Sequence, residues 1–318
     1  MTRTLYLAAA GCAVALLLSA AGAAAGEANS RAGTSAFSFL KIDVGARAVA
    51  MGGAGTGLAD DESALYYNPA GIVGFEQRRF VGGYHSYFAD MQSGFVGYIA
   101  PIGLTKAVGA YLSYLNYGDF VETDPTGAVL GTFSGGDLLF AVSGAVQPRY
   151  GLALGATVKF IYESLHNYTA TGVAVDLGGR YSTNRDRLIV GLAVQHLGVQ
   201  FSGLGTEKDR LPLTVRGGAA LRPRGLPLTL AGDLIVPVDN DPSIALGLEY
   251  VELKPLYLRI GWNSFGSNYR TGDSDDSRAG LGLGVGFDIK TYHISYAFAP
   301  GAELGDSHRF TFSGGIFP

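Results

Sequence analysis

One stretch near the end of the chain reads Tyr292-His293-Ile294-Ser295-Tyr296-Ala297-Phe298, in which large apolar side chains alternate with small or polar ones. A period of two is typical of a β-strand, because successive side chains point to opposite faces. The same alternation recurs over 309–316 and 171–182. Each segment therefore has one apolar face and one face of small or charged residues.

Segment length indicates which kind of β-protein this is. A soluble sandwich would show the same alternation, but segments of about ten to fourteen residues suit strands that cross a bilayer at a tilt. Outward from 292–298, candidate strands lie at about 79–88, 92–100, 105–117, 137–147, 150–162, 170–182, 187–197, 211–221, 226–236, 243–252, 256–263, 278–288, 291–299 and 307–317. The sequence therefore predicts an all-β membrane protein, an antiparallel transmembrane barrel of about fourteen strands.

Connection lengths alternate along these candidates. The short ones lie at 101–104, 148–149, 183–186, 222–225, 253–255 and 289–290, whereas long ones lie at 118–136, 198–210 and 263–277. Bacterial outer-membrane barrels have short periplasmic turns and longer surface loops. We therefore predict a bacterial outer-membrane location, with the N-terminus and the short turns in the periplasm.

Composition agrees with this class. The 318 residues are 47% hydrophobic and only 16% charged, and they include 48 glycines. Glycines at 280, 282, 284 and 286 alternate along one face, as a crowded barrel interior would favour. The net charge of −4 argues against a nucleic-acid partner. The expected surrounding of a barrel of this class is outer-membrane lipid.

The first 78 residues divide into two parts. Residues 1–25 have the pattern of a cleaved signal peptide, with Arg3, an apolar run and a small-residue site before Gly26. The only cysteine, Cys12, lies in that leader. Residues 26–78 lack strand alternation and show short helical spacings, so we predict a partly helical plug, or hatch, inside a barrel of residues 79–318.

Charged residues on the inward-facing positions are candidates for selecting a permeant molecule or for pairing with one another and with the plug. They are Lys159, Asp176, Arg180, Arg216, Asp233, Glu249, Arg259 and Arg309. The acidic stretches 239–241 and 273–276 lack the spacing of a calcium-binding EF-hand loop. For these we expect solvated loops, and no metal or other cofactor.

A resemblance to a known family rests on two motifs. Residues 39–54 include Gly45-Ala46-Arg47-Ala48, and residues 59–71 include Asp60-Asp61 and Asn68-Pro69-Ala70-Gly71. Together they resemble the N-terminal signature of the PorV/PorQ family, which is similar to the FadL-type group of fourteen-stranded outer-membrane barrels. The resemblance implies that Arg47, Asp60, Asp61, Asn68, Pro69 and Gly71 belong to the plug, where they either form a gate or tie the plug to the wall.

The resemblance also implies two alternative functions. FadL-type proteins conduct small hydrophobic molecules, whereas PorV is a carrier that binds exported proteins at the cell surface as a component of a secretion system. A third class, the hydrolases, would need a nucleophile beside a base. Only His293 and Ser295 suggest such a pair, and no third orienting group is evident from the sequence. We therefore expect no enzyme, and we favour the conduit with the carrier as its alternative.

Overall fold

A computed structural model describes residues 31–87, 90–183, 187–269, 278–301 and 305–316. The predicted signal peptide and the acidic stretch 273–276 lie outside these residues. No helix among the described residues is both long and apolar enough to cross a membrane.

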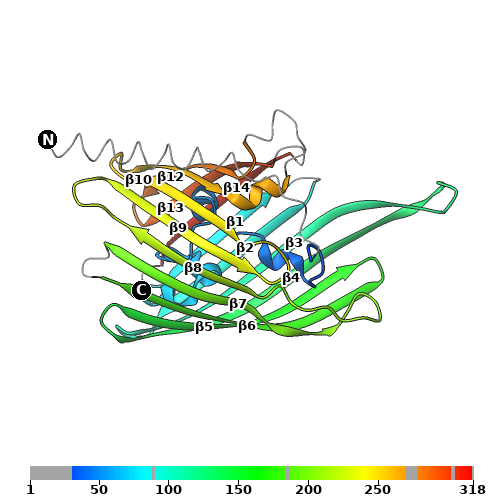
Figure 1. The fold of residues 1–318 in the computed structure, drawn as a ribbon, viewed down its shortest axis with the longest axis horizontal. Coiled ribbons are helices and arrows are strands. Elements are labelled where there is room, and N and C mark those ends of the chain that lie inside the picture. The colour runs from blue at the N-terminus through cyan, green and yellow to red at the C-terminus, as the bar shows by residue number, and fades with distance from the viewer. Residues whose placement is uncertain (1–30, 88–89, 184–186, 270–277, 302–304, 317–318) are drawn as a thin grey trace.

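Fourteen strands close into one barrel, in which each strand pairs antiparallel with its neighbours in sequence and β1 pairs with β14 (Figure 1). The strands are β1 (Arg79–Ser86), β2 (Gln92–Pro101), β3 (Lys106–Thr123), β4 (Val129–Arg149), β5 (Leu152–Leu165), β6 (Tyr168–Ser182), β7 (Leu188–Ser202), β8 (Thr214–Leu221), β9 (Leu228–Pro237), β10 (Ser243–Tyr250), β11 (Leu256–Asn263), β12 (Leu281–Ile289), β13 (Tyr292–Pro300) and β14 (Asp306–Gly315). The predicted strand number and closure are confirmed.

The alternation of side chains sets which face of each strand points outward. On β13, Ile294 is 42% exposed and Ser295 only 2%, and on β14 Phe310 is exposed while Arg309 is buried. The barrel therefore presents an apolar outer surface and a lumen of small, polar and charged residues, as expected for a membrane barrel.

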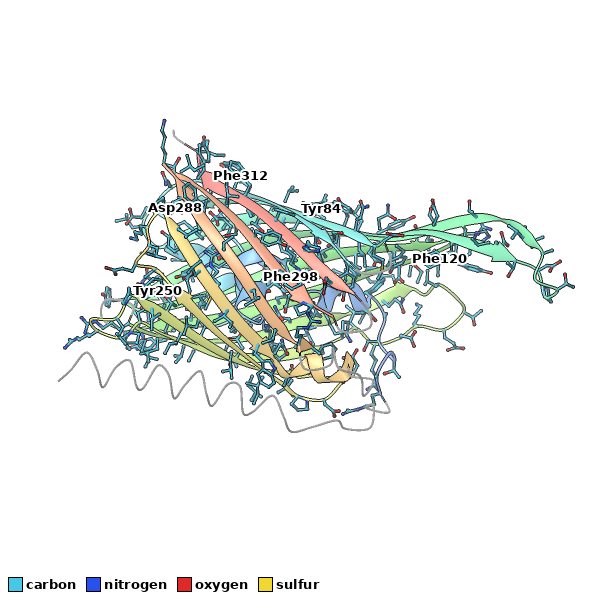
Figure 2. The ribbon with its side chains drawn as sticks, turned by 90° about the horizontal axis from the view of Figure 1, so that it is seen from above. Tyr84, Phe120, Tyr250, Asp288, Phe298 and Phe312 are labelled. Atoms are coloured by element: carbon cyan, nitrogen blue, oxygen red, sulfur yellow. The ribbon has the colours of Figure 1, made fainter. Side chains whose placement is uncertain are left out.

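Connections of two lengths define the two ends of the barrel. The short-turn end carries the connections β2–β3, β4–β5, β6–β7, β8–β9, β10–β11 and β12–β13, and the opposite end, called here the long-loop end, carries the others. A difference from the prediction concerns 118–136, expected to be a surface loop. Most of it continues β3 and β4 as a paired hairpin that projects beyond the barrel, where Phe120 stacks on Phe133 with centroids 5.3 Å apart (Figures 1 and 2).

The described residues before β1, 31–78, form what we call the inner segment. It contains η1 (Ser38–Lys41), α2 (Ala46–Ala50), α3 (Ala64–Tyr67) and η2 (Pro69–Gly74). It begins at the long-loop end, where Ser35 bridges Arg210, and it runs through the lumen to β1 at the short-turn end. The first described residues thus lie at the opposite end of the barrel from the short turns.

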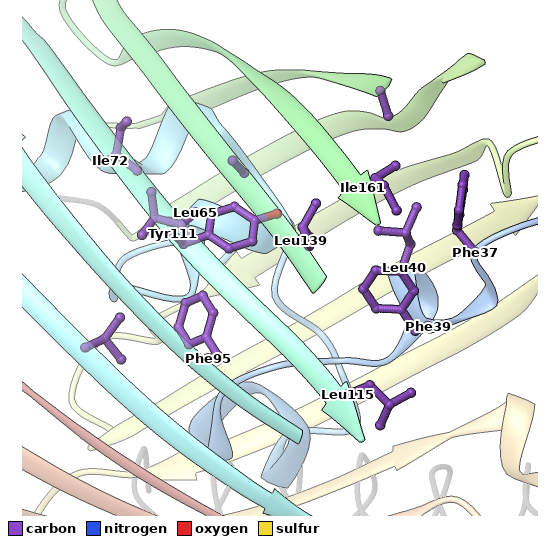
Figure 3. Close-up of a cluster of buried hydrophobic side chains, with 14 of the residues drawn as sticks. Phe37, Phe39, Leu40, Leu65, Ile72, Phe95, Tyr111, Leu115, Leu139 and Ile161 are labelled. Atoms are coloured by element: carbon purple, nitrogen blue, oxygen red, sulfur yellow. The ribbon is translucent and has the colours of Figure 1, made fainter. Parts of the chain in front are cut away.

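A hydrophobic cluster joins the inner segment to the wall. Leu40 and Leu65 of the inner segment belong to the same buried cluster as Phe95, Tyr111 and Leu139 of the wall (Figure 3). On the other side of the lumen, α2 packs against β12 and β13. A Cβ at Gly261 would collide with the backbone of Met51 and Gly52, so only glycine permits this close approach.

Candidate functional site

Arg47, placed in the lumen by the short helix α2, is the centre of an ion-pair network. Its Nε and Nη2 donate to the two carboxylate oxygens of Glu249 on β10, each at 2.8 Å. Its Nη1 donates to Asp60 Oδ1 at 2.6 Å and to Asp61 Oδ2 at 3.1 Å. Arg47 therefore joins two carboxylates of the inner segment to one carboxylate of the barrel wall.

Asp60 has a second cationic partner, because Arg222 Nη2, beside the end of β8, also donates to it. Burial by itself would raise the pKa of Asp60, but the guanidinium groups of Arg47 and Arg222 hold that pKa below its ordinary value of 3.8. The carboxylate is therefore charged at neutral pH, and it links Arg47 within the inner segment to Arg222 on the wall.

Glu249 continues the network along the wall. It accepts from Arg259 Nε at 2.8 Å, and Arg259 in turn donates to Ser295 Oγ at 2.8 Å and contacts His293 Nε2 at 3.1 Å. Arg259 guanidinium also fills the space that a Cβ at Gly286 would need. The predicted lumen residues Glu249 and Arg259 thus pair with each other and with the inner segment.

A third, orienting group lies beside His293 and Ser295, and it was not evident from the sequence. Asp288, which pairs across the strands with His293, lies 2.5 Å from His293 Nδ1, and Ser295 Oγ lies 2.9 Å from His293 Nε2. The order resembles that of a hydrolytic triad. Ser295 is buried and its oxygen accepts from Arg259, so the arrangement helps to position the guanidinium.

Asn68 fastens the inner segment a second time. Its Nδ2 donates to Thr56 O and to Gly179 O of β6, both at 3.1 Å, and its Oδ1 accepts from Ala70 N at 3.2 Å as the N-cap of η2. Pro69 begins that helix, where a missing N–H has no cost. Gly71 contacts Ala59, where a Cβ has no room. These residues hold a tight turn against the wall.

Other wall side chains satisfy backbone groups of the inner segment, which would otherwise be buried without partners. Asp233 Oδ2 accepts from Thr56 N at 2.8 Å, and Arg216 Nη2 donates to Gly53 O at 2.6 Å. Further bonds of this kind come from Thr311, Gln195 and Asn263. Lumen residues therefore act as hydrogen-bond partners for a chain segment with little regular structure.

Lys159 and Asp176 form a fully buried ion pair of 2.6 Å. His196 joins it, since its backbone N donates to Asp176 Oδ1 at 2.8 Å and its Nδ1 lies 3.1 Å from Lys159 Nζ. His196 sits in a β-bulge of β7 with φ 62°, a strained conformation for a residue other than glycine. Arg309 bonds to Ser307 at 2.9 Å, and Arg180 is half-buried on β6.

Two cavities lie on either side of the inner segment. The first, of about 340 Å³, lies toward the long-loop end and is lined by Ile42, Tyr66, His196, Arg216, Ile235 and Phe265, among others. The second, of about 490 Å³, lies toward the short-turn end beside Arg47, Asp60 and His293. The inner segment contributes to both, so it separates them.

A third cavity, of about 520 Å³, lies at the base of the projecting hairpin and is lined by Phe37, Tyr117 and Leu204, among others. Ser38 of η1 lines both this third cavity, called here the vestibule, and the 340 Å³ cavity. Lys41 of the same helix pairs with Asp239 at 2.5 Å. The expectation that 239–241 is a solvated loop is therefore wrong for Asp239, which is buried.

Within the described ranges, no group of three or more His, Cys, Asp or Glu side chains is arranged to hold a metal ion. The carboxylates of Asp60 and Asp61 share Arg47.

Comparison with known proteins establishes the class of this fold. No family model matches the sequence, and no curated protein matches it. Among solved structures, the P. putida toluene transporter TodX matches with a TM-score of 0.63 at 14% identity, covering 86% of this chain and 99% of that chain. The Ralstonia pickettii toluene transporter TbuX matches with 0.63 at 15% identity, covering 87% and 100%.

A FadL homologue from Pseudomonas aeruginosa matches with a TM-score of 0.53 at 13% identity, covering 86% of this chain and 97% of that chain. The chain therefore has the fold of the FadL-like fourteen-stranded barrels. The finer resemblance to PorV/PorQ proteins stays a prediction.

Proposed function

We propose that this protein is an outer-membrane conduit for small hydrophobic molecules, with the inner segment as its plug. The observation that carries the proposal is a closed FadL-like barrel whose lumen holds separate cavities on the two sides of that segment. The toluene transporters TodX and TbuX share this fold. A barrel of this class with an apolar outer surface supports placement in the outer membrane.

The dimensions of the first cavity support a small substrate. Pockets for small ligands range from about 300 to 1,000 Å³ and are mostly apolar with a few polar groups. The 340 Å³ cavity fits this description, since Ile42, Ile235 and Phe265 share its lining with Arg216 and His196. The route that follows from the geometry leads from the vestibule past η1 into this cavity, and then past the inner segment to the short-turn end.

The ion pairs of Arg47 give the plug its proposed role. A plug that moves must be held by contacts that can break and form again, whereas a plug that stays in place needs only packing against the wall. The network of Arg47, Asp60 and Glu249 borders the 490 Å³ cavity and is partly accessible, with Asp60 23% exposed at its side chain. We infer that these pairs hold the plug closed and that their exchange opens the exit.

The experiment that tests this function is uptake of radiolabelled toluene by cells that produce the protein, compared with cells carrying an empty vector. Faster uptake is expected from the wild type. Arg47→Lys, which keeps the charge but loses the paired hydrogen bonds to Glu249, is expected to change the rate. Equal rates in producing and empty cells would refute the conduit.

The carrier alternative has one structural feature in its favour. The hairpin of β3 and β4 projects from the long-loop end and exposes Val121, Val129 and Leu130, as a surface for an exported protein would. Removing the hairpin tip, residues 119–134, tests it. A carrier would lose bound exported proteins in a pull-down, whereas a conduit would keep its uptake of toluene.

A further inference from the structure

A ring of exposed cations encircles the short-turn end, although the chain as a whole has a net charge of −4. Six exposed basic residues stand there, namely Arg78, Lys106, Arg149, Arg224, Lys254 and Lys290. One precedes β1, and the others lie in or directly beside five different turns, so they are distributed around the circumference. In the described part of this end, only Glu76 and Glu252 are exposed carboxylates.

Unlike the cations of the lumen, these have no charged partner among the residues that the structure describes. The lumen guanidinium groups are paired, as Arg47 is with Glu249 and Arg79 with Glu62. None of the six forms a salt bridge or a side-chain hydrogen bond with a described residue. Six charges of one sign repel one another, and an anionic partner would relieve that repulsion.

Apolar side chains stand beside the cations and place them at the edge of the apolar surface. Leu104 is 96% exposed two residues before Lys106, and Tyr150, directly after Arg149, is 78% exposed. Leu253 and Ile289 are exposed beside Lys254 and Lys290. An apolar or aromatic side chain next to a cation is typical of the boundary between acyl chains and headgroups.

From this pattern we propose that the ring binds anionic phospholipid headgroups of the leaflet that surrounds the short-turn end. The inference rests on the membrane placement proposed above. The distribution favours lipid over a protein partner, because a single protein would contact one arc or cover the mouth, whereas a lipid annulus meets every turn. Basic residues close to a membrane surface attract anionic lipids through their charge, an attraction that salt screens.

Lipid selectivity of the purified protein tests the ring without measuring transport. The protein in a neutral detergent is given equal amounts of phosphatidylglycerol and phosphatidylcholine, and the lipids retained after washing are counted by mass spectrometry. A rim variant, Lys106→Gln, Arg224→Gln and Lys254→Gln, is compared with a matched variant at the long-loop end, Arg31→Gln, Lys208→Gln and Arg210→Gln. Both lose three positive charges.

The wild type and the matched variant are expected to retain phosphatidylglycerol over phosphatidylcholine by about tenfold in low salt, and the rim variant by less than threefold. Raising the salt to about 0.5 M should abolish the difference. Equal selectivity in the two variants would overturn the proposal. Binding of soluble polyglutamate that depends on the ring, without any lipid preference, would overturn it in favour of an acidic protein partner. This assay does not measure uptake, so its result holds even if the protein fails to take up toluene.

Discussion

Arg47 and Glu249 join the inner segment to the barrel wall through two parallel hydrogen bonds of 2.8 Å each. The two residues are 202 positions apart in the chain, so this contact forms only when the inner segment lies inside the finished barrel. The pair is nearly buried, with 15% of the Arg47 side chain and 5% of the Glu249 side chain exposed. Removing one partner therefore leaves the other charge largely out of water.

Replacing Glu249 by Gln should loosen the inner segment without opening the barrel wall. The substitution removes the charge that Arg47 and Arg259 share, and breaking a buried pair in this way costs about 3 kcal/mol. The wall remains closed because its hydrogen bonds run from strand to strand. Passive influx of small sugars into vesicles containing the protein should rise. The control is Glu163→Gln on β5, because Glu163 forms no ion pair with a described residue, and an equal rise there would contradict the account.

Asn68→Ala tests the second attachment. The substitution removes the bonds to Thr56 O and Gly179 O and the cap of η2, at a cost of about 2 kcal/mol. Limited proteolysis should then cut the inner segment faster than the barrel. The variant Asn116→Ala, whose side chain caps an exposed turn, should leave the cutting rate of the inner segment unchanged.

Gly261→Ala should displace the inner segment, because the added methyl would meet the backbone of Met51 and Gly52. Overpacking of this kind costs about 1 to 3 kcal/mol, and a lower unfolding temperature would show it. Gly217→Ala is the matched control, since no atom lies within 4 Å of a Cβ built there. If both variants unfold at the wild-type temperature, the close approach of segment and wall is not present in solution.

Acid should weaken the attachment at Asp60. The pKa of this carboxyl is lowered in the folded protein, so the stabilisation is present above the ordinary value of 3.8 and is lost as pH falls through the lowered value. Proteolytic susceptibility of the inner segment, assayed with pepsin, should therefore increase below about pH 4. Asp60→Asn should be more susceptible at neutral pH and should lack that part of the pH dependence.

Topology can be read with single cysteines, because the only cysteine of the chain is Cys12. An impermeant thiol reagent applied to whole cells should label Thr126→Cys, at the tip of the projecting hairpin, and spare Arg224→Cys in a short turn. Labelling of Arg224→Cys alone would show that the barrel is inserted the other way round.

The barrel could be predicted from the sequence because lipid outside and a packed lumen inside impose alternation on every strand. Beyond the barrel this constraint on the side chains is absent, and the structure predicted from the sequence was wrong there. The outer parts of β3 and β4 project beyond the barrel, so Val121 and Leu130 are exposed without alternating, and the segment resembled a loop. Asp239 was expected in solvent because its partner, Lys41, is distant in sequence.

The candidate site was predictable as a set of residues but not as a network. The motifs predicted that Arg47, Asp60 and Asn68 belong to one segment inside the barrel, and inward alternation predicted that Glu249 faces the lumen. Their pairing depends on the register of α2 against the wall, which no local pattern encodes. Asp288 was missed because its contact with His293 is made across two strands, and His196 because a bulge interrupts the alternation of β7.

The most direct test of the conduit is the rate at which a labelled hydrocarbon crosses a membrane containing only this protein. In vesicles that contain only lipid and the purified wild-type protein, no other cellular component can move the hydrocarbon. Its free diffusion is measured in protein-free vesicles and subtracted. Equilibration faster than in protein-free vesicles, and altered by Glu249→Gln, is the result that the account predicts. Equal rates in vesicles with and without the protein would contradict it.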